Sequence, residues 1–187
     1  NCELIRGYKA MEFNEAVLYE VDEGVGIVTI SSPETRNALT DEVKQGLFQV
    51  IDEVERNPEV KVVVITGTDK AFSAGGNIKG MGKRTVLQSI DIMTNTTNLL
   101  LRLSDLKKPI IMAVNGYAMG AGFSLVLAGD IIFADEEAKF GLSFTKVGLI
   151  PDAGLLYHLP RIVGPWKAKE LYLRCKNFIC NGSRTIW

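Results

Sequence analysis

The sequence predicts an α/β fold, and three observations carry this prediction. The chain alternates between strand, glycine-rich loop and helix. The run "VKVVVIT" is too uniformly apolar for a half-exposed strand, which indicates a central strand covered on both faces. A second run of this kind, "IIMAV", follows Pro109. Strands that alternate with helices are typical of an α/β protein built on parallel strands.

The N-terminal half begins with a predicted hairpin, in which "AVLYEV" and "GIVTIS" flank the glycine-containing connection "DEGV". A helix follows, with Thr40 as its cap and with Asp41 and Glu42 in its first turn, where acidic side chains favour the helix dipole. Its apolar residues recur at helical spacing and predict one buried face: Val43, Leu47, Val50, Ile51 and Val54.

The C-terminal half starts with a long amphipathic helix predicted over residues 85–106. The segment "VNGYAMGAGFSLVLAGD" reads as a buried helix apart from its glycines, and a short strand "IIFAD" and an extended piece "AKFG" follow it. Helical pieces are expected over 154–159 and 166–173. No repeat or linker marks a boundary, so residues 1–187 are expected to form a single domain.

Charge and cysteine usage exclude several function classes. With 21 basic and 22 acidic side chains the net charge is −1, so we expect neither nucleic acid nor an acidic membrane surface as a partner. Three cysteines, Cys2, Cys175 and Cys180, lack a CxxC or zinc spacing, so neither a disulfide framework nor a metal site is expected. No apolar run reaches membrane-spanning length, and a cytoplasmic protein is expected.

Two glycine-rich loops, "FSAGGN" and "NGYAMGAG", each follow a predicted buried strand. Backbone N–H groups in such loops can approach a ligand closely, and two loops could converge on one oxygen atom. The alternative is tight packing without a ligand. Neither phosphate-binding motif is present, because GxxxxGK[ST] would need a glycine at Asn77 and a hydroxyl at Arg84, and GxGxxG does not fit either loop.

Four motifs resemble the crotonase family, the enoyl-CoA hydratase/isomerase superfamily, and they occur in the family's order: "RNAL", "AFSAGGNIKGM", "KPIIMAVNGYAMGAGFSLVLAGDIIFAD" and "AKFGLSFTKVGLIPDAG". This resemblance implies a ClpP/crotonase-like fold of repeated ββα units and an acyl-CoA thioester as substrate. It implies no separate cofactor, because coenzyme A is part of the substrate. It also implies an oxyanion hole, in which the backbone N–H groups of Gly76 and Ala121 would stabilise an enolate oxygen.

The same resemblance implies a set of substrate-binding residues. The coenzyme A groove would be lined by Arg36, a candidate phosphate contact, with Ala38 and Ala74. The residues expected to contact coenzyme A or the acyl group are, in full, Arg36, Ala38, Ala74, Gly75, Gly76, Asn77, Ile78, Ala121, Ser124 and Phe144.

Departures from the family pattern bear on the chemistry. The two glutamates with which hydratases of the family activate water correspond to Ser124 and Phe144 here, so simple hydration is not expected. Asp152 corresponds to the acid of several isomerase branches, such as the ring epoxide isomerases that act on phenylacetyl-CoA derivatives and read "GLIPD" before a glycine pair; here Gly154 precedes Leu155. The alternative role for Asp152 is a helix cap.

We therefore expect an isomerase that acts on an unsaturated or ring-activated acyl-CoA, with Asp152 as its base. The alternatives are a hydratase or hydrolase in which Ser124 positions water, and a non-catalytic acyl-CoA-binding or assembly module. Family members continue past "AKELYL" into helices that close the acyl pocket and support trimers or hexamers. We thus expect a C-terminally truncated domain that self-associates, with an atypical tail over 174–187.

Overall fold

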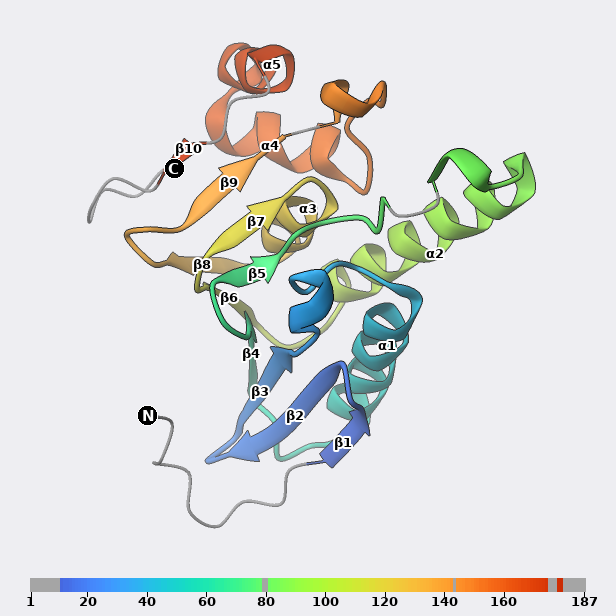
Figure 1. The fold of residues 1–187 in the computed structure, drawn as a ribbon. Coiled ribbons are helices and arrows are strands. Elements are labelled where there is room, and N and C mark those ends of the chain that lie inside the picture. Colours follow the sequence, from blue (N-terminus) through green and yellow to red (C-terminus); the bar gives the residue numbers. More distant parts are fainter. Residues whose placement is uncertain (1–10, 79–80, 143, 175–177, 180–187) are drawn as a thin grey trace.

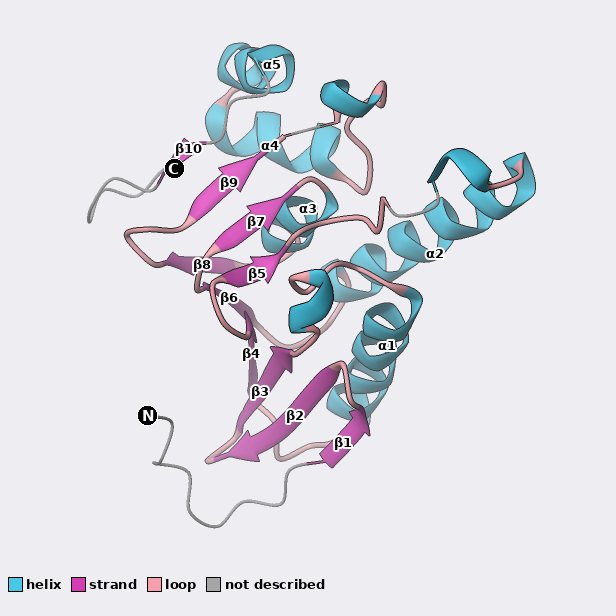
Figure 2. Cartoon of the chain, viewed as in Figure 1, coloured by secondary structure: helices cyan, strands magenta, loops and turns pink. Residues whose placement is uncertain are grey.

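The structure is a computed structural model that describes residues 11–78, 81–142, 144–174 and 178–179. Figures 1 and 2 show how its strands and helices alternate along the chain. The described strands are β1 (Met11–Asn14), β2 (Val17–Asp22), β3 (Val25–Ile30), β4 (Val62–Gly67), β5 (Ala71–Ser73), β6 (Ile110–Val114), β7 (Tyr117–Met119), β8 (Ile131–Ala134), β9 (Lys139–Gly141) and β10 (Phe178–Ile179). The described helices are α1 (Asp41–Arg56), α2 (Val86–Ser104), α3 (Ala121–Leu127), α4 (Leu155–Val163) and α5 (Pro165–Arg174), with short 3-10 turns η1 (Pro33–Thr35), η2 (Met81–Lys83) and η3 (Thr145–Val147).

The strands form two sheets. The larger has the order β1-β2-β3-β4-β6-β8, in which β1, β2 and β3 pair antiparallel and the remaining neighbours pair parallel. The smaller has the order β10-β9-β7-β5, in which only β10 is antiparallel to its neighbour. The predicted α/β class is therefore confirmed, and β4, which contains most of "VKVVVIT", lies inside the larger sheet as expected.

A unit of two strands and one helix occurs three times in succession. In each, the first strand joins the larger sheet, the second joins the smaller sheet, and a helix follows: β4, β5 and α2; then β6, β7 and α3; then β8, β9 and α4. This is the repeated ββα arrangement that the sequence motifs imply. Because β5, β7 and β9 are parallel, the loops that follow them leave the smaller sheet at the same edge.

The two predictions for the N-terminal half are confirmed. Strands β2 and β3 pair in register from Val17 to Asp22, and a two-residue turn connects them in which Glu23 has φ 44° and Gly24 has φ 86°. In α1 the Thr40 hydroxyl oxygen accepts a hydrogen bond from the Val43 N–H at 3.2 Å. The predicted apolar face of α1 is buried: Val43, Leu47, Val50, Ile51 and Val54.

Two short strands were not predicted. Residues 71–73 were assigned to a glycine loop and residues 117–119 to a buried helix, but they form β5 and β7. The helix in that second segment covers only Ala121–Leu127. A strand of three residues is too short for its own periodicity to reveal it, since pairing with a partner far along the chain stabilises it.

Several glycines of "VNGYAMGAGFSLVLAGD" are required by packing. A Cβ atom at Gly116 would lie 2.1 Å from the Lys70 carbonyl oxygen, and one at Gly122 would lie 2.5 Å from the carbonyl oxygen of Ser73. At Gly129 it would lie 2.5 Å from Cγ of Met112. Tight packing, the alternative to ligand access, therefore explains these three glycines.

Within the ranges that the structure describes, no helix is both long and apolar enough to cross a lipid bilayer. The same ranges contain no group of three or more His, Cys, Asp or Glu side chains that could hold a metal ion. The three cysteines and most of the tail over 174–187 lie outside the described residues.

Candidate active site

The loop after β5 and the loop that joins β7 to α3 touch each other at Gly75. Gly75 has φ +93°, and a Cβ atom there would lie 2.3 Å from the Met119 carbonyl oxygen and 3.3 Å from the Ala121 nitrogen. No larger residue fits between the two backbones. The structure thus brings the predicted pair Gly76 and Ala121 to adjacent positions.

The backbone N–H groups of Gly76 and Ala121 donate no hydrogen bond within the described part of the chain. Gly76 pairs with Leu39 in a single parallel bridge, but the donor there is the Leu39 N–H, which bonds the Gly75 carbonyl at 2.8 Å. Ala121 is the first residue of α3, where an N–H has no acceptor inside the helix. A Cβ atom at Gly76 would meet no atom within 4 Å, so the space beside it is open.

Gly76 and Ala121 both line a cavity of about 290 Å³. Its other walls come from the N-terminal turns of α1, the first half of α2 and the segment before α4. The complete lining is Leu39, Thr40, Asp41, Lys44, Gly76, Asn77, Arg84, Ser89, Ile92, Met93, Thr96, Thr97, Ala121, Leu149, Ile150, Asp152 and Ala153. Apolar and hydroxyl side chains are mixed in this wall, and four charged residues belong to it.

Asp152 is the predicted catalytic residue with the most distinctive surroundings. Its Oδ1 atom is buried and has no hydrogen-bond partner in the described residues. Burial raises the pKa of Asp152, against a smaller opposing effect of a hydrogen bond from its own backbone N–H. The alternative role as a helix cap is wrong, because the N-cap of α4 is Gly154 and no side chain caps that helix.

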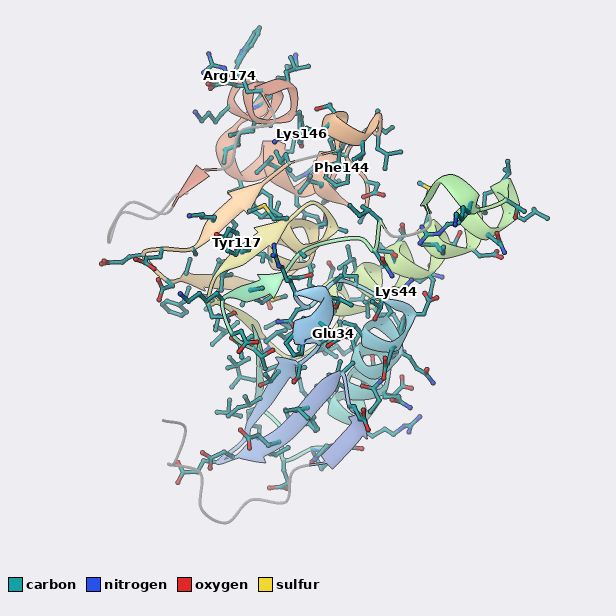
Figure 3. All side chains as sticks on the ribbon, in the orientation of Figure 1. Glu34, Lys44, Tyr117, Phe144, Lys146 and Arg174 are labelled. Atoms are coloured by element: carbon teal, nitrogen blue, oxygen red, sulfur yellow. The ribbon has the colours of Figure 1, made fainter. Side chains whose placement is uncertain are left out.

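Ser124 and Phe144, the positions that match the hydratase glutamates, are not among the residues that line the cavity. Ser124 is buried in α3, and its hydroxyl donates to the Asp152 carbonyl at 3.4 Å, which ties α3 to the segment that carries the carboxylate. Phe144 is buried behind the second loop, 3.7 Å from a Cβ atom built at Gly120. Figure 3 labels Phe144 near the segment before α4.

The segment Arg36–Ala38 runs beside the first loop. The Ala74 N–H donates to the Arg36 carbonyl at 2.9 Å, and Arg36 itself is exposed with φ 55°. Asn37, which the sequence argument did not single out, is buried, and its side-chain amide donates to the carbonyl of Ala71 at 2.7 Å. This buried amide fixes the "RNAL" segment against β5.

Some of the residues predicted to contact coenzyme A line the cavity, and others lie outside its wall. Asn77 lines the cavity, and its carbonyl accepts a hydrogen bond from Arg84 at 3.0 Å. The other predicted contacts lie outside the cavity wall, namely Arg36, Ala38, Ala74, Gly75 and Ile78. Their proposed contacts with coenzyme A stay predictions.

Sequence reasoning missed the cavity wall that α1 and α2 supply. In α2 the lining residues recur at helical spacing: Ser89, Ile92, Met93, Thr96 and Thr97. That spacing was visible as a stripe of hydroxyl and apolar residues, but it was interpreted only as an amphipathic helix. Lys44 of α1 was missed as well, although it stands next to Val43 on the buried side of the helix.

Comparison with known proteins gives a consistent result. A model of the family described as enoyl-CoA hydratase/isomerase matches residues 20–182. A 1,2-epoxyphenylacetyl-CoA isomerase from Escherichia coli is 37% identical over 163 residues, which are 85% of this chain and 62% of that protein. A probable mitochondrial enoyl-CoA hydratase from Dictyostelium discoideum is 40% identical over 156 residues, which are 82% of this chain and 54% of that protein.

Superposition on solved structures leads to the same family as the sequence comparison. An enoyl-CoA hydratase from Bacillus anthracis superposes with a TM-score of 0.84 at 28% identity, covering 88% of this chain and 64% of that one. One from Polaromonas sp. JS666 superposes with a TM-score of 0.83 at 34% identity, covering 87% of this chain and 65% of that one. The chain therefore has the crotonase fold, and it spans about 62% of the length of the first curated relative named above.

Proposed function

Because the chain belongs to the enoyl-CoA hydratase/isomerase family, we propose that its cavity binds the acyl group of a coenzyme A thioester and moves a proton on it. One observation carries the proposal. Two residues whose backbone N–H groups have no acceptor in the described part of the chain, and Asp152, whose buried Oδ1 has no donor there, all line the same cavity. Such groups are costly to bury unpaired, and a thioester that enolises can satisfy them.

The proposed reaction is an isomerisation. Asp152 removes a proton from a carbon activated by the thioester carbonyl, and the electron pair of that C–H bond moves toward the carbonyl oxygen. The N–H groups of Gly76 and Ala121 donate to this oxygen as its negative charge develops. The carboxylic acid formed at Asp152 then returns the proton to a different carbon, so the double bond or ring is rearranged and no atoms are gained or lost.

Burial makes Asp152 suitable for this role. A carboxylate whose pKa is raised by desolvation binds a proton more readily, so it is a stronger base at neutral pH than an exposed aspartate. Leu149 and Ile150, close to Asp152 in sequence, contribute apolar residues to the lining of the same cavity.

A hydratase or hydrolase is the second candidate, and names of hydratases are common among the relatives. In that reaction Asp152 would activate a water molecule at the same cavity. A direct role for Ser124 in holding this water is disfavoured, because its hydroxyl is bonded to the Asp152 carbonyl and lies outside the cavity wall. A protein that only binds acyl-CoA is the third candidate.

Incubation of the protein with an enoyl-CoA in heavy water separates these candidates. Isomerisation predicts that deuterium enters the acyl chain, as measured by mass spectrometry. Hydration predicts loss of the ultraviolet absorbance of the conjugated thioester together with a mass gain of one water. Binding without either change would contradict both enzymatic proposals.

The described surface also favours self-association, which the family resemblance implies in the form of trimers or hexamers. Trp166 and Leu173 of α5 are 81% and 79% exposed, and Leu156 and Tyr157 of α4 are exposed near them in sequence. Exposed apolar groups of this kind are typical of protein interfaces. Sedimentation equilibrium is expected to show an oligomer that Trp166→Ser weakens, whereas a monomer at high concentration would contradict the proposal.

The expected cytoplasmic location stays a prediction.

A further inference from the structure

One wall of the cavity contains a buried cation that the proposed reaction does not use. The Lys44 side chain is only 2% exposed, although its residue lines the cavity. It occupies the buried side of α1 beside Val43 and Leu47, a position where this helix is otherwise apolar. Figure 3 labels Lys44 near the N-terminal end of α1. A charge held at such a position is costly unless a partner compensates it.

The protein compensates Lys44 only in part. Its Nζ atom lies 2.8 Å from a carboxylate oxygen of Asp41, one turn earlier in the same helix, and Asp41 is 85% exposed. An ammonium group has three N–H donors. Within the described residues, the Lys44 ammonium forms this ion pair and no other ion pair or hydrogen bond. A partner so exposed is well solvated and screened, so it contributes little. The remaining donors of the ammonium group have no acceptor among the described residues.

A second cation lines the same cavity. Arg84 precedes α2 and donates one hydrogen bond, to the Asn77 carbonyl at 3.0 Å. Its guanidinium has five N–H donors, and among the described residues only the Asn77 carbonyl accepts a hydrogen bond from it. Four residues with hydroxyl groups also line the cavity, namely Thr40, Ser89, Thr96 and Thr97.

The carboxylates of the cavity do not balance these cations completely. Asp41 is directed largely to solvent, as its exposure indicates, and within the described residues Asp152 forms no ion pair with Lys44 or Arg84. A plain hydrocarbon chain in this cavity would offer no acceptor to the N–H donors of Lys44 and Arg84. A site built in this way discriminates against ligands that lack the matching polar group.

We infer that the cavity selects an acyl group that carries a carboxylate at its far end, and that Lys44 is the residue that recognises this carboxylate. The substrate class is thus the coenzyme A monothioester of a dicarboxylic acid. Lys44 keeps its contact with Asp41 and donates a further hydrogen bond to the acyl carboxylate, while Arg84 is the second cation of the site. This inference rests on the proposed function, because it assumes that the acyl group of a thioester occupies the cavity.

The test compares two saturated thioesters of equal carbon number, glutaryl-CoA and pentanoyl-CoA, by isothermal titration calorimetry. They differ only in a terminal carboxylate against a methyl group, and neither has a double bond to rearrange. The protein is expected to bind glutaryl-CoA roughly tenfold more tightly or better, the effect of one hydrogen bond between charged groups. Equal affinities, or tighter binding of pentanoyl-CoA, would overturn the inference.

Two variants assign the preference to Lys44. Lys44→Met keeps much of the length of the side chain without its charge, and it is expected to reduce the affinity ratio to about one. It should not unfold the protein, since an apolar side chain suits a buried position without the cost of burying a charge. Asp41→Asn keeps Lys44 and removes the negative charge of its partner, and it is expected to maintain or increase the affinity ratio. A preference that survives in Lys44→Met, or disappears in Asp41→Asn, would contradict the role of Lys44.

The outcomes also separate this inference from the proposed function. If pentanoyl-CoA and glutaryl-CoA both bind with equal affinity, the site accepts acyl-CoA and only the selection by Lys44 is wrong. If neither thioester binds to the folded protein, the proposed function fails and the inference fails with it.

Discussion

The two walls of the cavity are built in different ways. One wall consists of backbone, in the loops after β5 and β7, where Gly75 allows two chain segments to touch and where Gly76 and Ala121 border the cavity. The opposite wall consists of side chains from α1 and α2, among them Lys44, Thr96 and Thr97. Every residue type except proline presents the same backbone N–H, whereas side chains differ from one residue type to the next. The backbone wall therefore suits a step shared by many substrates, and the side-chain wall suits the selection among them.

Asp152, the proposed base, belongs to neither of these two walls. Its substitution should have the largest effect on the exchange rate. Asp152→Asn is expected to lower deuterium exchange into an enoyl-CoA by roughly 10²–10⁴-fold, the usual contribution of a general base. In the unmodified protein, exchange should rise with pH as the carboxyl group loses its proton and should level off above its raised pKa. Full exchange in the variant would exclude Asp152 as the base.

The same variant has a predicted effect on stability that serves as its folding control. Because the folded state raises the pKa of Asp152, the protonated form favours folding and the wild-type protein loses that contribution as pH rises through the raised pKa. Asp152→Asn cannot ionise, so near neutral pH it should be at least as stable as wild type in urea. The difference should shrink below the pKa of an unfolded aspartate, about 3.9.

The backbone wall is tested by removal of one donor. Ala121→Pro deletes the N–H at the first position of α3, where proline is well tolerated in helices, and should lower the exchange rate by roughly 10²–10³-fold. Ala121→Ser retains the N–H and is the matched control, with near-normal exchange expected. If a folded Ala121→Pro protein exchanged as fast as Ala121→Ser, this N–H would have no role.

Substitutions at two adjacent glycines of the backbone wall, Gly75 and Gly76, distinguish an effect on stability from an effect on function. Gly75→Ala forces a Cβ atom to 2.3 Å from the Met119 carbonyl oxygen at φ +93°, and should reduce the free energy of unfolding by about 3 kcal/mol. Gly76→Ala meets no protein atom within 4 Å and should change stability by less than about 1 kcal/mol, while its methyl group narrows the cavity. Equal losses of stability, measured by urea denaturation, would contradict this division.

The smallest effect is expected outside both walls, at Arg36. This exposed side chain is the proposed phosphate contact of coenzyme A, and Arg36→Ala should weaken binding of free coenzyme A by up to about fivefold, as is usual for an exposed ion pair. The effect should diminish at high salt. Lys83→Ala, which removes another exposed cation, is the control; an identical loss there would indicate general attraction and no specific contact.

Much of the fold was predictable because its signals are local. The hairpin turn at Glu23 and Gly24, the Thr40 cap and the buried face of α1 each depend on residues within one turn or one strand pair. The strands β5 and β7 could not be predicted, because three residues have no usable periodicity and acquire their structure by pairing with each other. The glycines at 116 and 122 were visible, but the atoms they must accommodate belong to Lys70 and Ser73.

In the candidate site, too, some features were predictable from the sequence and others were not. The motifs of the sequence determined the family, the two loops and the position of Asp152, because these depend on residue type at fixed spacing. Only the tertiary structure decided that Asp152 is not a helix cap, that Ser124 and Phe144 lie outside the cavity, and that Lys44 is a buried member of its wall. The reason is physical. The charge state and hydrogen bonding of a side chain depend on which atoms exclude water from it, and the cavity that Lys44 and Asp152 line is built from helices and loops far apart in the sequence.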